Sequence, residues 1–177
     1  MPRYVALLRA INVGGHVVKM DRLRALFEAL GFTNVETFIA SGNVLFDAAA
    51  RDASALERCI EKHLGQALGY EVATFLRTPA ELAALAALDP FGVGVAKSPS
   101  VYVTFLREPP PPVYVARLEG FRSDQDDLKV IGRETWWACR TSILESPFGK
   151  AKPDKSVVGT ARNITTVRKL ALLSGKK

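Results

Sequence analysis

The chain has 177 residues, of which 48% are hydrophobic and 24% are charged, an ordinary composition for a globular protein with a sizeable core. No apolar run reaches the roughly 20 residues of a membrane helix, and the run that follows Met1 is too short for a secretory signal. We therefore expect a soluble, cytoplasmic protein without membrane partners. The two cysteines lack metal-ligand or disulfide-framework spacing, so we predict no bound metal.

The net charge of +6 is unevenly distributed along the chain. Residues 1–98 carry 10 basic and 10 acidic side chains, whereas residues 99–177 carry 14 and 8. A basic carboxyl-terminal half attracts phosphate-rich partners over a long range, although a solvated basic surface explains the same excess. The charge favours a phosphate-bearing ligand such as nucleic acid and names no reaction.

The first half of the sequence alternates strand-like and helix-like segments. Continuous apolar residues predict a strand buried on both faces, and apolar residues at a spacing of three and four predict helices. The expected elements are a strand at 4–9, a helix at 20–30, strands at 35–40 and 44–46, a helix that starts at 52–54, a strand at 71–76 and a helix at 78–88. This βαββαβ order favours an antiparallel sheet with both helices on one face, the ferredoxin-like arrangement.

The second half repeats this order in a degenerate form. The expected elements are a strand at 101–106, a helix at 113–121, strands at 128–131 and 135–140, and a last helix that follows Thr160. The predicted fold class is therefore α+β, with two ferredoxin-like halves that have antiparallel sheets. We expect the halves to span 1–90 and 98–177, with a linker at 90–98.

A glycine turn connects the first strand to the first helix. Gly14 and Gly15 permit backbone conformations that other residues avoid, and a helix that follows such a turn presents free N–H groups to an anion. Arg9, Asn12 and Lys19 are the candidate side-chain contacts. The pattern lacks the G-x-G-x-x-G fingerprint, so no dinucleotide or other cofactor is predicted. A tight turn in which Asn12 binds its own backbone is the alternative.

A second small turn, Ser41-Gly42-Asn43, joins the two central strands and contributes Ser41 and Asn43 to the candidate site. Catalysis would require Ser41 as nucleophile and His16 as base, but the flanking residues do not form a nucleophile elbow. We predict no catalytic residue and retain His16 and Ser41 as the weakest candidates.

A third turn begins at Thr160, where we expect the last helix to start. Arg162 is a fork-shaped donor suited to phosphate, and Asn163 is a good helix-capping residue. The alternative is a capped surface helix with solvated basic side chains.

Trp136 and Trp137 are neighbours on an expected strand, so their side chains point to opposite faces. One belongs to the core of its half. For the other we prefer burial between the halves to an exposed position that stacks on a nucleobase.

Several short motifs resemble the bacterial domain-of-unknown-function family 1697. They are Tyr4–Gly15, Met20 with Leu23, Gly31-Phe32, Ser41–Val44 and Thr160–Asn163 with Thr166-Val167. The resemblance runs from residue 3 to about residue 172. It implies a fold of two ferredoxin-like halves, but it implies no particular activity or ligand. Family positions fall on Arg9, Asn12, Gly14, Gly15, Ser41, Gly42, Asn43, Arg162 and Asn163. This chain departs from the family at Ala10, Ala40 and Ile164, where glycine, glutamine and tryptophan are usual.

Three functions are compatible with these patterns. The first is a non-catalytic module that binds phosphate-bearing ligands such as nucleic acid. The second is a small enzyme that acts on a polar or phosphorylated metabolite between the halves, and the third is a protein-interaction adaptor. The first two require the three turns to meet around one hollow. The oligomeric state is left open.

Overall fold

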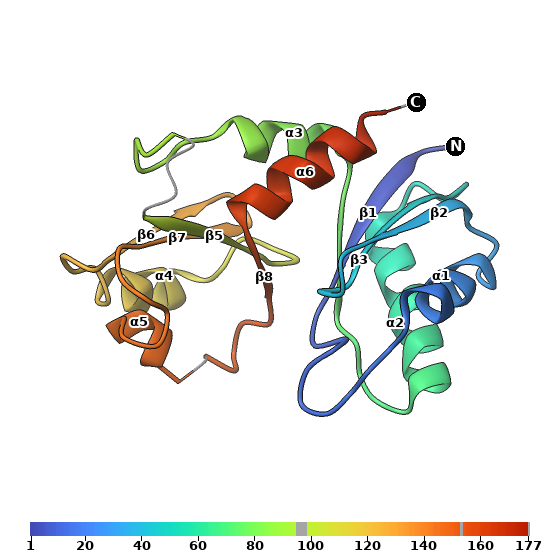
Figure 1. Ribbon diagram of the computed structural model, residues 1–177, viewed down its shortest axis with the longest axis horizontal. Helices are drawn as coiled ribbons and strands as arrows, with labels where there is room; N and C mark the ends of the chain where they lie inside the picture. Colours follow the sequence, from blue (N-terminus) through green and yellow to red (C-terminus); the bar gives the residue numbers. More distant parts are fainter. Residues whose placement is uncertain (95–98, 153, 177) are drawn as a thin grey trace. The chain divides into compact units, whose positions relative to one another are not determined.

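The computed structural model describes residues 1–94, 99–152 and 154–176 (Figure 1). It is a mixed α+β structure with two four-stranded antiparallel sheets. The chain forms two compact units. Met1–Ala84 together with Arg168–Lys177 form the first unit, and Leu85–Val167 form the second unit.

The first unit has the predicted βαββαβ order. Its elements are β1 (Arg3–Leu8), α1 (Met20–Glu28), β2 (Thr33–Phe38), β3 (Asn43–Asp47), α2 (Ala53–Leu68) and β4 (Thr74–Arg77), followed by the start of α3 (Pro79–Ala87). The strand order is β2-β3-β1-β4, and every neighbouring pair is antiparallel. Chain order and strand order together are those of a split βαβ arrangement.

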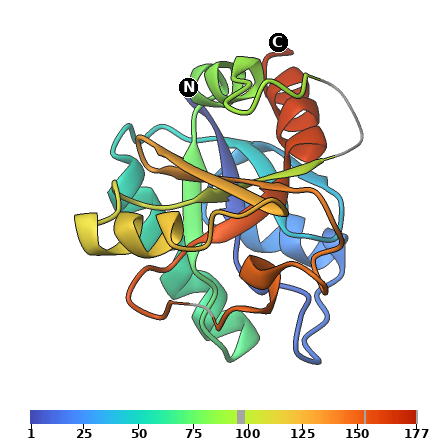
Figure 2. The ribbon, with the colours of Figure 1, turned by 90° about the vertical axis from the view of Figure 1, so that its left-hand side faces the viewer.

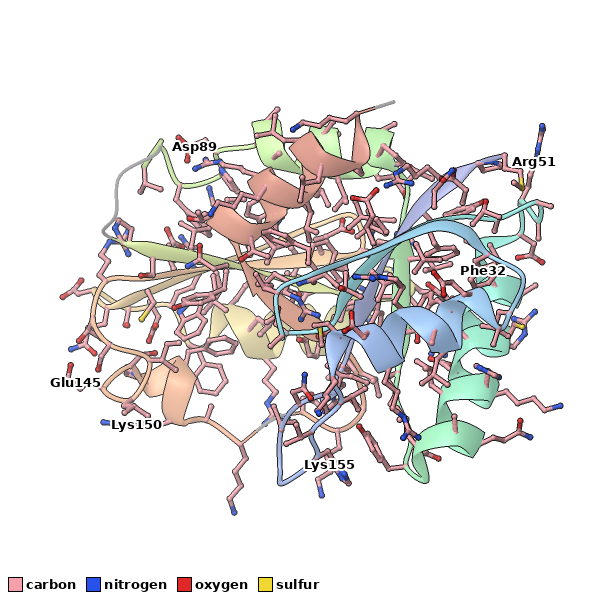
Figure 3. The ribbon with its side chains drawn as sticks, turned by 45° about the vertical axis from the view of Figure 1, so that its right-hand side comes forward. Phe32, Arg51, Asp89, Glu145, Lys150 and Lys155 are labelled. Carbon is pink, nitrogen blue, oxygen red and sulfur yellow. The ribbon has the colours of Figure 1, made fainter. Side chains whose placement is uncertain are left out.

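The central strand β1 is buried on both faces, as its continuous apolar run predicts. Every residue of Tyr4–Leu8 is buried. Helices α1 and α2 lie on one face of the sheet (Figure 1), where buried apolar residues of both helices and the strands form a single core. Phe32 lies inside this core between the strands and α1 (Figure 3) and stacks on Phe46 with ring centroids 4.5 Å apart.

Helix α2 also protects the edge of this sheet. It begins at Asp52, whose carboxylate accepts from the backbone N–H of Ala55. One turn further on, the Glu57 carboxylate accepts from the N–H of Leu76 at 2.8 Å, and that of Glu61 accepts from the N–H of Thr74 at 2.8 Å. Two outward backbone donors of the edge strand β4 are thereby satisfied.

The second unit repeats the strand order. Its elements are β5 (Ser100–Phe105), α4 (Pro112–Glu119), β6 (Asp126–Ile131), β7 (Glu134–Cys139), α5 (Pro147–Lys150), β8 (Thr160–Asn163) and the first residues of α6 (Ile164–Ser174). The order β6-β7-β5-β8 corresponds strand by strand to that of the first unit. The predicted degeneracy is real, since the four-residue α5 stands where the first unit has the 16-residue α2.

The prediction that the last helix starts at Thr160 is wrong. Thr160–Asn163 form the strand β8, which pairs with β5 so that Arg162 lies opposite Val103 and Thr160 opposite Phe105. The helix begins only at Ile164. Small polar residues resemble a helix start in sequence, but here the open edge of β5 provides backbone partners that favour an extended strand.

Trp136 and Trp137 point to opposite faces of β7, as predicted. Trp136 is fully buried. Trp137 packs against Phe148, with ring centroids 5.0 Å apart, and against Tyr102 at 5.1 Å. These contacts lie within the second unit, on the face that carries α4 and α5 (Figures 1 and 2). Trp137 is therefore the tryptophan that belongs to the core of its own unit, and the expected burial of the other tryptophan between the halves stays a prediction.

The compact units differ from the predicted halves. The division falls within α3 at residues 84 and 85, and Arg168–Lys177 are grouped with the first unit. Part of the predicted linker at 90–98 lies outside the described residues. Counted by unit, the first has 13 basic and 9 acidic residues and the second has 11 and 9. The larger excess of positive charge therefore belongs to the first unit.

Candidate functional site

Two of the three predicted turns come together at one end of the first unit's sheet. Because β1 and β3 are antiparallel, with Leu7 opposite Asn43, the end of β1 lies beside the start of β3. The N–H of Leu8 donates to the carbonyl of Gly42 at 2.8 Å. The glycine turn after β1 and the Ser41-Gly42-Asn43 turn therefore share one edge.

Asn12 fastens the glycine loop to the second turn. Its Oδ1 accepts from the N–H of Val18 at 2.6 Å, which closes the loop, and its Nδ2 donates to the carbonyl of Ala40 at 2.8 Å. Both ends of the amide are thus used by the backbone. Asn12 positions the loop, which is the structural alternative that the sequence left open.

The glycines of the two turns have different roles. Gly14 and Gly15 have φ of 63° and 87° within a turn that the N–H of His16 closes on the carbonyl of Val13, and a Cβ on either glycine would meet open space. They are required for backbone conformation. A Cβ on Gly42, by contrast, would lie 2.5 Å from Cγ2 of Ile11. Gly42 is required for close packing.

Two non-glycine residues in these turns also have left-handed backbone angles. Ala10 has φ of 58°, and the β-branched Ile39 has φ of 52°. Such conformations cost about 1–3 kcal/mol each and concentrate at functional sites. The hydrogen bonds of Asn12 hold the two strained turns together.

Asn43 is a buried support for the hairpin. Its side chain is fully buried and donates to the carbonyl of Phe38 at 2.9 Å and to the hydroxyl of Ser41 at 3.0 Å. Asn43 therefore positions Ser41 and the turn from within the core, and it presents no group to solvent.

A third segment, which the sequence analysis did not single out, completes this edge. The hydroxyl of Tyr70 donates to the carbonyl of Ile11 at 3.0 Å, and its ring stacks on that of His16 at 3.8 Å with an interplanar angle of 20°. Burial raises the pKa of the Tyr70 phenol, so the hydroxyl remains a donor. The N–H of Arg9 binds the carbonyl of Ala73 in the same segment. Nothing in the local sequence marks Tyr70, because its partners lie about 60 residues earlier.

We call Arg9, His16, Lys19, Ser41 and Tyr70 the loop surface. All but the half-buried Tyr70 are exposed. The loop surface combines two cationic side chains, a stacked pair of aromatic rings and a turn whose two glycines are open to solvent. These groups suit a ligand that carries both phosphate and a flat ring.

The same contacts weigh against serine chemistry. A serine nucleophile needs a base that accepts its proton and a third group that orients the base. The ring of His16 packs on Tyr70, and the hydroxyl of Ser41 accepts from Asn43. Neither contact activates Ser41.

The third predicted turn lies in the second unit and has a different character. The Arg162 side chain is buried in β8 and donates to the hydroxyl of Thr160 and the carbonyl of Ala161, each at 2.8 Å. Burial lowers the pKa of Arg162 to about 10, so it still carries its charge at neutral pH. Asn163 caps α6 by accepting from the N–H of Thr165. The convergence of this segment with the loop surface stays a prediction.

Two further properties concern the described part of the chain. Residues 1–94, 99–152 and 154–176 contain no group of three or more histidine, cysteine, aspartate or glutamate residues placed to hold a metal ion. Across the same ranges, every helix is too short or too polar to cross a lipid bilayer.

The fold is that of an α+β protein with two antiparallel sheets of the same strand order. The chain is similar over 99% of its length to the conserved bacterial protein SP0830 from Streptococcus pneumoniae. The match also covers 99% of that protein, with a TM-score of 0.76 and 24% sequence identity. This likeness shows the fold alone. A search among curated proteins found no significant match.

The family is shown by the sequence itself. Residues 1–136 match the family model described as "Protein of unknown function (DUF1697)", and the chain belongs to this family. The match contains every residue of the loop surface. Arg162 and Asn163 lie beyond it, in the part of the chain where the sequence prediction of a helix start was wrong.

Proposed function

We propose that this protein is a non-catalytic binding module whose loop surface holds a phosphate-bearing ligand, with single-stranded nucleic acid as the expected partner. The proposal includes a ferredoxin-like first unit as the scaffold. It also includes a cytoplasmic location, in which the exposed thiol of Cys59 stays reduced.

The observation that carries the proposal is the His16–Tyr70 stack on a loop that also carries two exposed cations. Arg9 and Lys19 supply the positive charges, which attract phosphate oxygens and release counterions. The ring of His16 is supported from behind by Tyr70 at 3.8 Å, so it offers a fixed platform on which a base stacks at little entropic cost. The first unit also has the larger excess of basic residues, and this charge further favours the binding of an anionic ligand.

The support for the loop is rigid. Asn12, Gly42 and the hydroxyl of Tyr70 each tie one segment of the site to another. A surface that is organised before its ligand arrives loses less entropy on binding.

Fluorescence anisotropy with a labelled single-stranded RNA of mixed sequence tests the proposal. With two phosphate contacts, the logarithm of the association constant should fall with the logarithm of salt concentration at a slope of about −1.4. Arg9→Gln and Lys19→Gln should each reduce that slope by about 0.7. His16→Ala should weaken binding by about tenfold with little change in slope, because it removes the stacking ring and leaves Arg9 and Lys19 in place.

Arg51→Gln is the matched control. Arg51 is an exposed cation beyond the far end of β3 and projects outward there (Figure 3). Its removal lowers the net charge by the same amount and should leave affinity and slope almost unchanged. Absence of RNA and DNA binding at low salt, or equal losses in the Arg51 and Arg9 variants, would contradict the proposal.

A further inference from the structure

The second unit has an open groove between helix α4 and the edge strand β6. Its volume is about 220 Å³, and its apolar lining includes Val115 and Leu118 of α4 and Leu128 and Val130 of β6. We propose that this groove receives an extended peptide, which pairs with β6 as a fifth strand and places an acidic residue between two apolar residues. This interaction is separate from the proposed function of the loop surface.

The backbone of β6 can pair with a further strand, because β6 lies at the edge of its sheet. Strand β6 is an edge of the β6-β7-β5-β8 sheet, and a two-residue turn that begins at Gly132, with φ of 61°, joins it to β7. In such a hairpin the closing pair, Ile131 with Glu134, exchanges hydrogen bonds, and alternate residues direct their N–H and C=O groups outward. Leu128 and Val130 are the outward residues.

The outward groups are available along the last part of the strand. The carbonyl of Asp126, at the start of β6, accepts from the N–H of Ser123. For the backbone groups of Leu128 and Val130 that face away from β7, the described part of the chain provides no hydrogen-bond partner. A peptide backbone can therefore form up to four hydrogen bonds with this edge, as in other cases of strand addition.

The first unit shows why the groove is open. Its equivalent edge strand, β2, is preceded by Phe32, which fills the space between α1 and the sheet. The residue that precedes β6 is the exposed, polar Gln125. The aromatic residue that follows α4, Phe121, packs on Phe148 of α5 with ring centroids 5.5 Å apart and does not line the groove, so a guest side chain can enter it.

The alternation of side chains along β6 specifies the occupant. Leu128 and Val130 share the face that packs under α4, so apolar guest residues opposite them enter the groove. Lys129 points to the other face and is exposed. Its ammonium donates to the carbonyl of Pro90 and lies 5.5 Å from the ring centroid of Phe91, which leaves two of its three N–H donors for a guest. A guest residue opposite Lys129 is favoured when it is acidic.

The same lysine disfavours a second copy of the chain as the occupant. Two β6 strands paired antiparallel in the register that sets Leu128 opposite Val130 would place Lys129 directly opposite Lys129. Like charges at this position are destabilising, and an edge lysine is a common protection against self-association. An acidic residue in a foreign peptide removes this penalty.

Isothermal titration of the full chain tests the proposal with two capped eight-residue peptides. One has the central residues valine, glutamate, valine, and the other has valine, lysine, valine. We expect the glutamate peptide to bind and the lysine peptide to bind at least fivefold more weakly. Lys129→Glu should reverse this preference, whereas Lys62→Glu, which makes the same charge change on α2, should not.

A second variant tests the backbone contacts. Val130→Pro removes an outward N–H without touching the ladder to β7, and an edge strand tolerates proline there. This variant should bind the glutamate peptide at least tenfold more weakly. An unchanged tryptophan emission spectrum would show that it is folded. Binding that is indifferent to both variants overturns the proposal. So does a dimer in sedimentation that Val130→Pro abolishes, because a second copy is then the occupant.

Discussion

The two units share one strand order but differ in the segment that follows their third strand, β3 in the first unit and β7 in the second. In the first unit, α2 runs along β4 and supplies two carboxylates to its backbone N–H groups. In the second unit, the segment after β7 forms only the short α5, which the fully buried Asp126 holds against the sheet. A regular helix and a single buried carboxylate are thus alternative ways to complete the same topology.

The edge strands β2 and β6 differ in their surroundings as well. Phe32 closes the space between α1 and β2, whereas Phe121, which follows α4, packs on Phe148 of α5 and the space between α4 and β6 is open. The first unit is closed at this edge, and its loop surface lies on turns at one end of the sheet. The second unit presents an apolar groove beside an unpaired strand. One duplicated architecture therefore provides two distinct kinds of surface.

Removing Asp126 should produce the largest change in stability. Its carboxylate accepts from the indole N–H of Trp137 at 2.7 Å, the hydroxyl of Ser146 at 2.7 Å and the N–H of Phe148 at 3.2 Å. Asp126→Ala leaves all three donors unsatisfied and should lower the free energy of unfolding of the second unit by about 4 kcal/mol. Both tryptophans of the chain lie in this unit, so urea denaturation followed by tryptophan emission measures the effect directly.

Asp127→Ala is the control for this measurement. Asp127 forms an ion pair with the exposed Arg122 on the surface, and its loss should cost less than about 1 kcal/mol. Similar costs for the two variants would show that Asp126 does not hold α5 in place.

The corresponding test in the first unit is Glu57→Ala. The carboxylate of Glu57 is buried and accepts from the N–H of Leu76 at 2.8 Å. Its removal should destabilise the first unit by about 3 kcal/mol, because a buried donor loses a charged partner. Hydrogen exchange of the Leu76 amide should accelerate, while that of the second unit's sheet stays unchanged. Equal acceleration in both units would mean that they unfold together and that the comparison between them fails.

Gly42→Ala and Gly14→Ala separate the two roles of glycine at the loop surface. Both residues have positive φ, but only at Gly42 does a Cβ meet a packed side chain. Gly42→Ala should cost about 2 to 3 kcal/mol and Gly14→Ala about 1 kcal/mol, since the first adds overpacking to backbone strain. Thermal denaturation followed by circular dichroism measures both. Equal costs would show that the contact with Ile11 relaxes freely.

The smallest effect concerns the acid sensitivity of the first unit. Burial disfavours the charged form of Asp47, but hydrogen bonds from Asn34 and Arg3 and the charge of Arg3 outweigh it and hold the pKa of Asp47 below its usual value. A carboxyl with a lowered pKa stabilises the fold above the ordinary value of about 4, and this contribution disappears as the pH falls through the folded-state pKa.

Asp47→Asn should therefore cost about 1 to 2 kcal/mol at neutral pH and lose less stability than the parent chain between about pH 5 and pH 2. Denaturation midpoints at these pH values provide the measurement. Parallel pH profiles for the two proteins would contradict the assigned role of Asp47.

The sequence by itself determined most of the strands and helices, because their apolar residues recur at periods that only a strand or a helix can bury. It also determined that Gly14-Gly15 and Ser41-Gly42 belong to turns, since glycine accepts positive φ. It failed at Thr160–Asn163, whose polar residues have no local preference strong enough to predict β8.

Tertiary structure decided which of the candidate residues face solvent. The side chains of Arg162, Asn43 and Asn12 could in principle bind a ligand. Once the strands pair, however, each forms hydrogen bonds with the backbone or with neighbouring side chains. Tyr70 became part of the loop surface only because β1 and the segment before β4 meet at one edge. Hydrogen bonds over such distances in the chain depend on strand pairing, and no local pattern in the sequence encodes them.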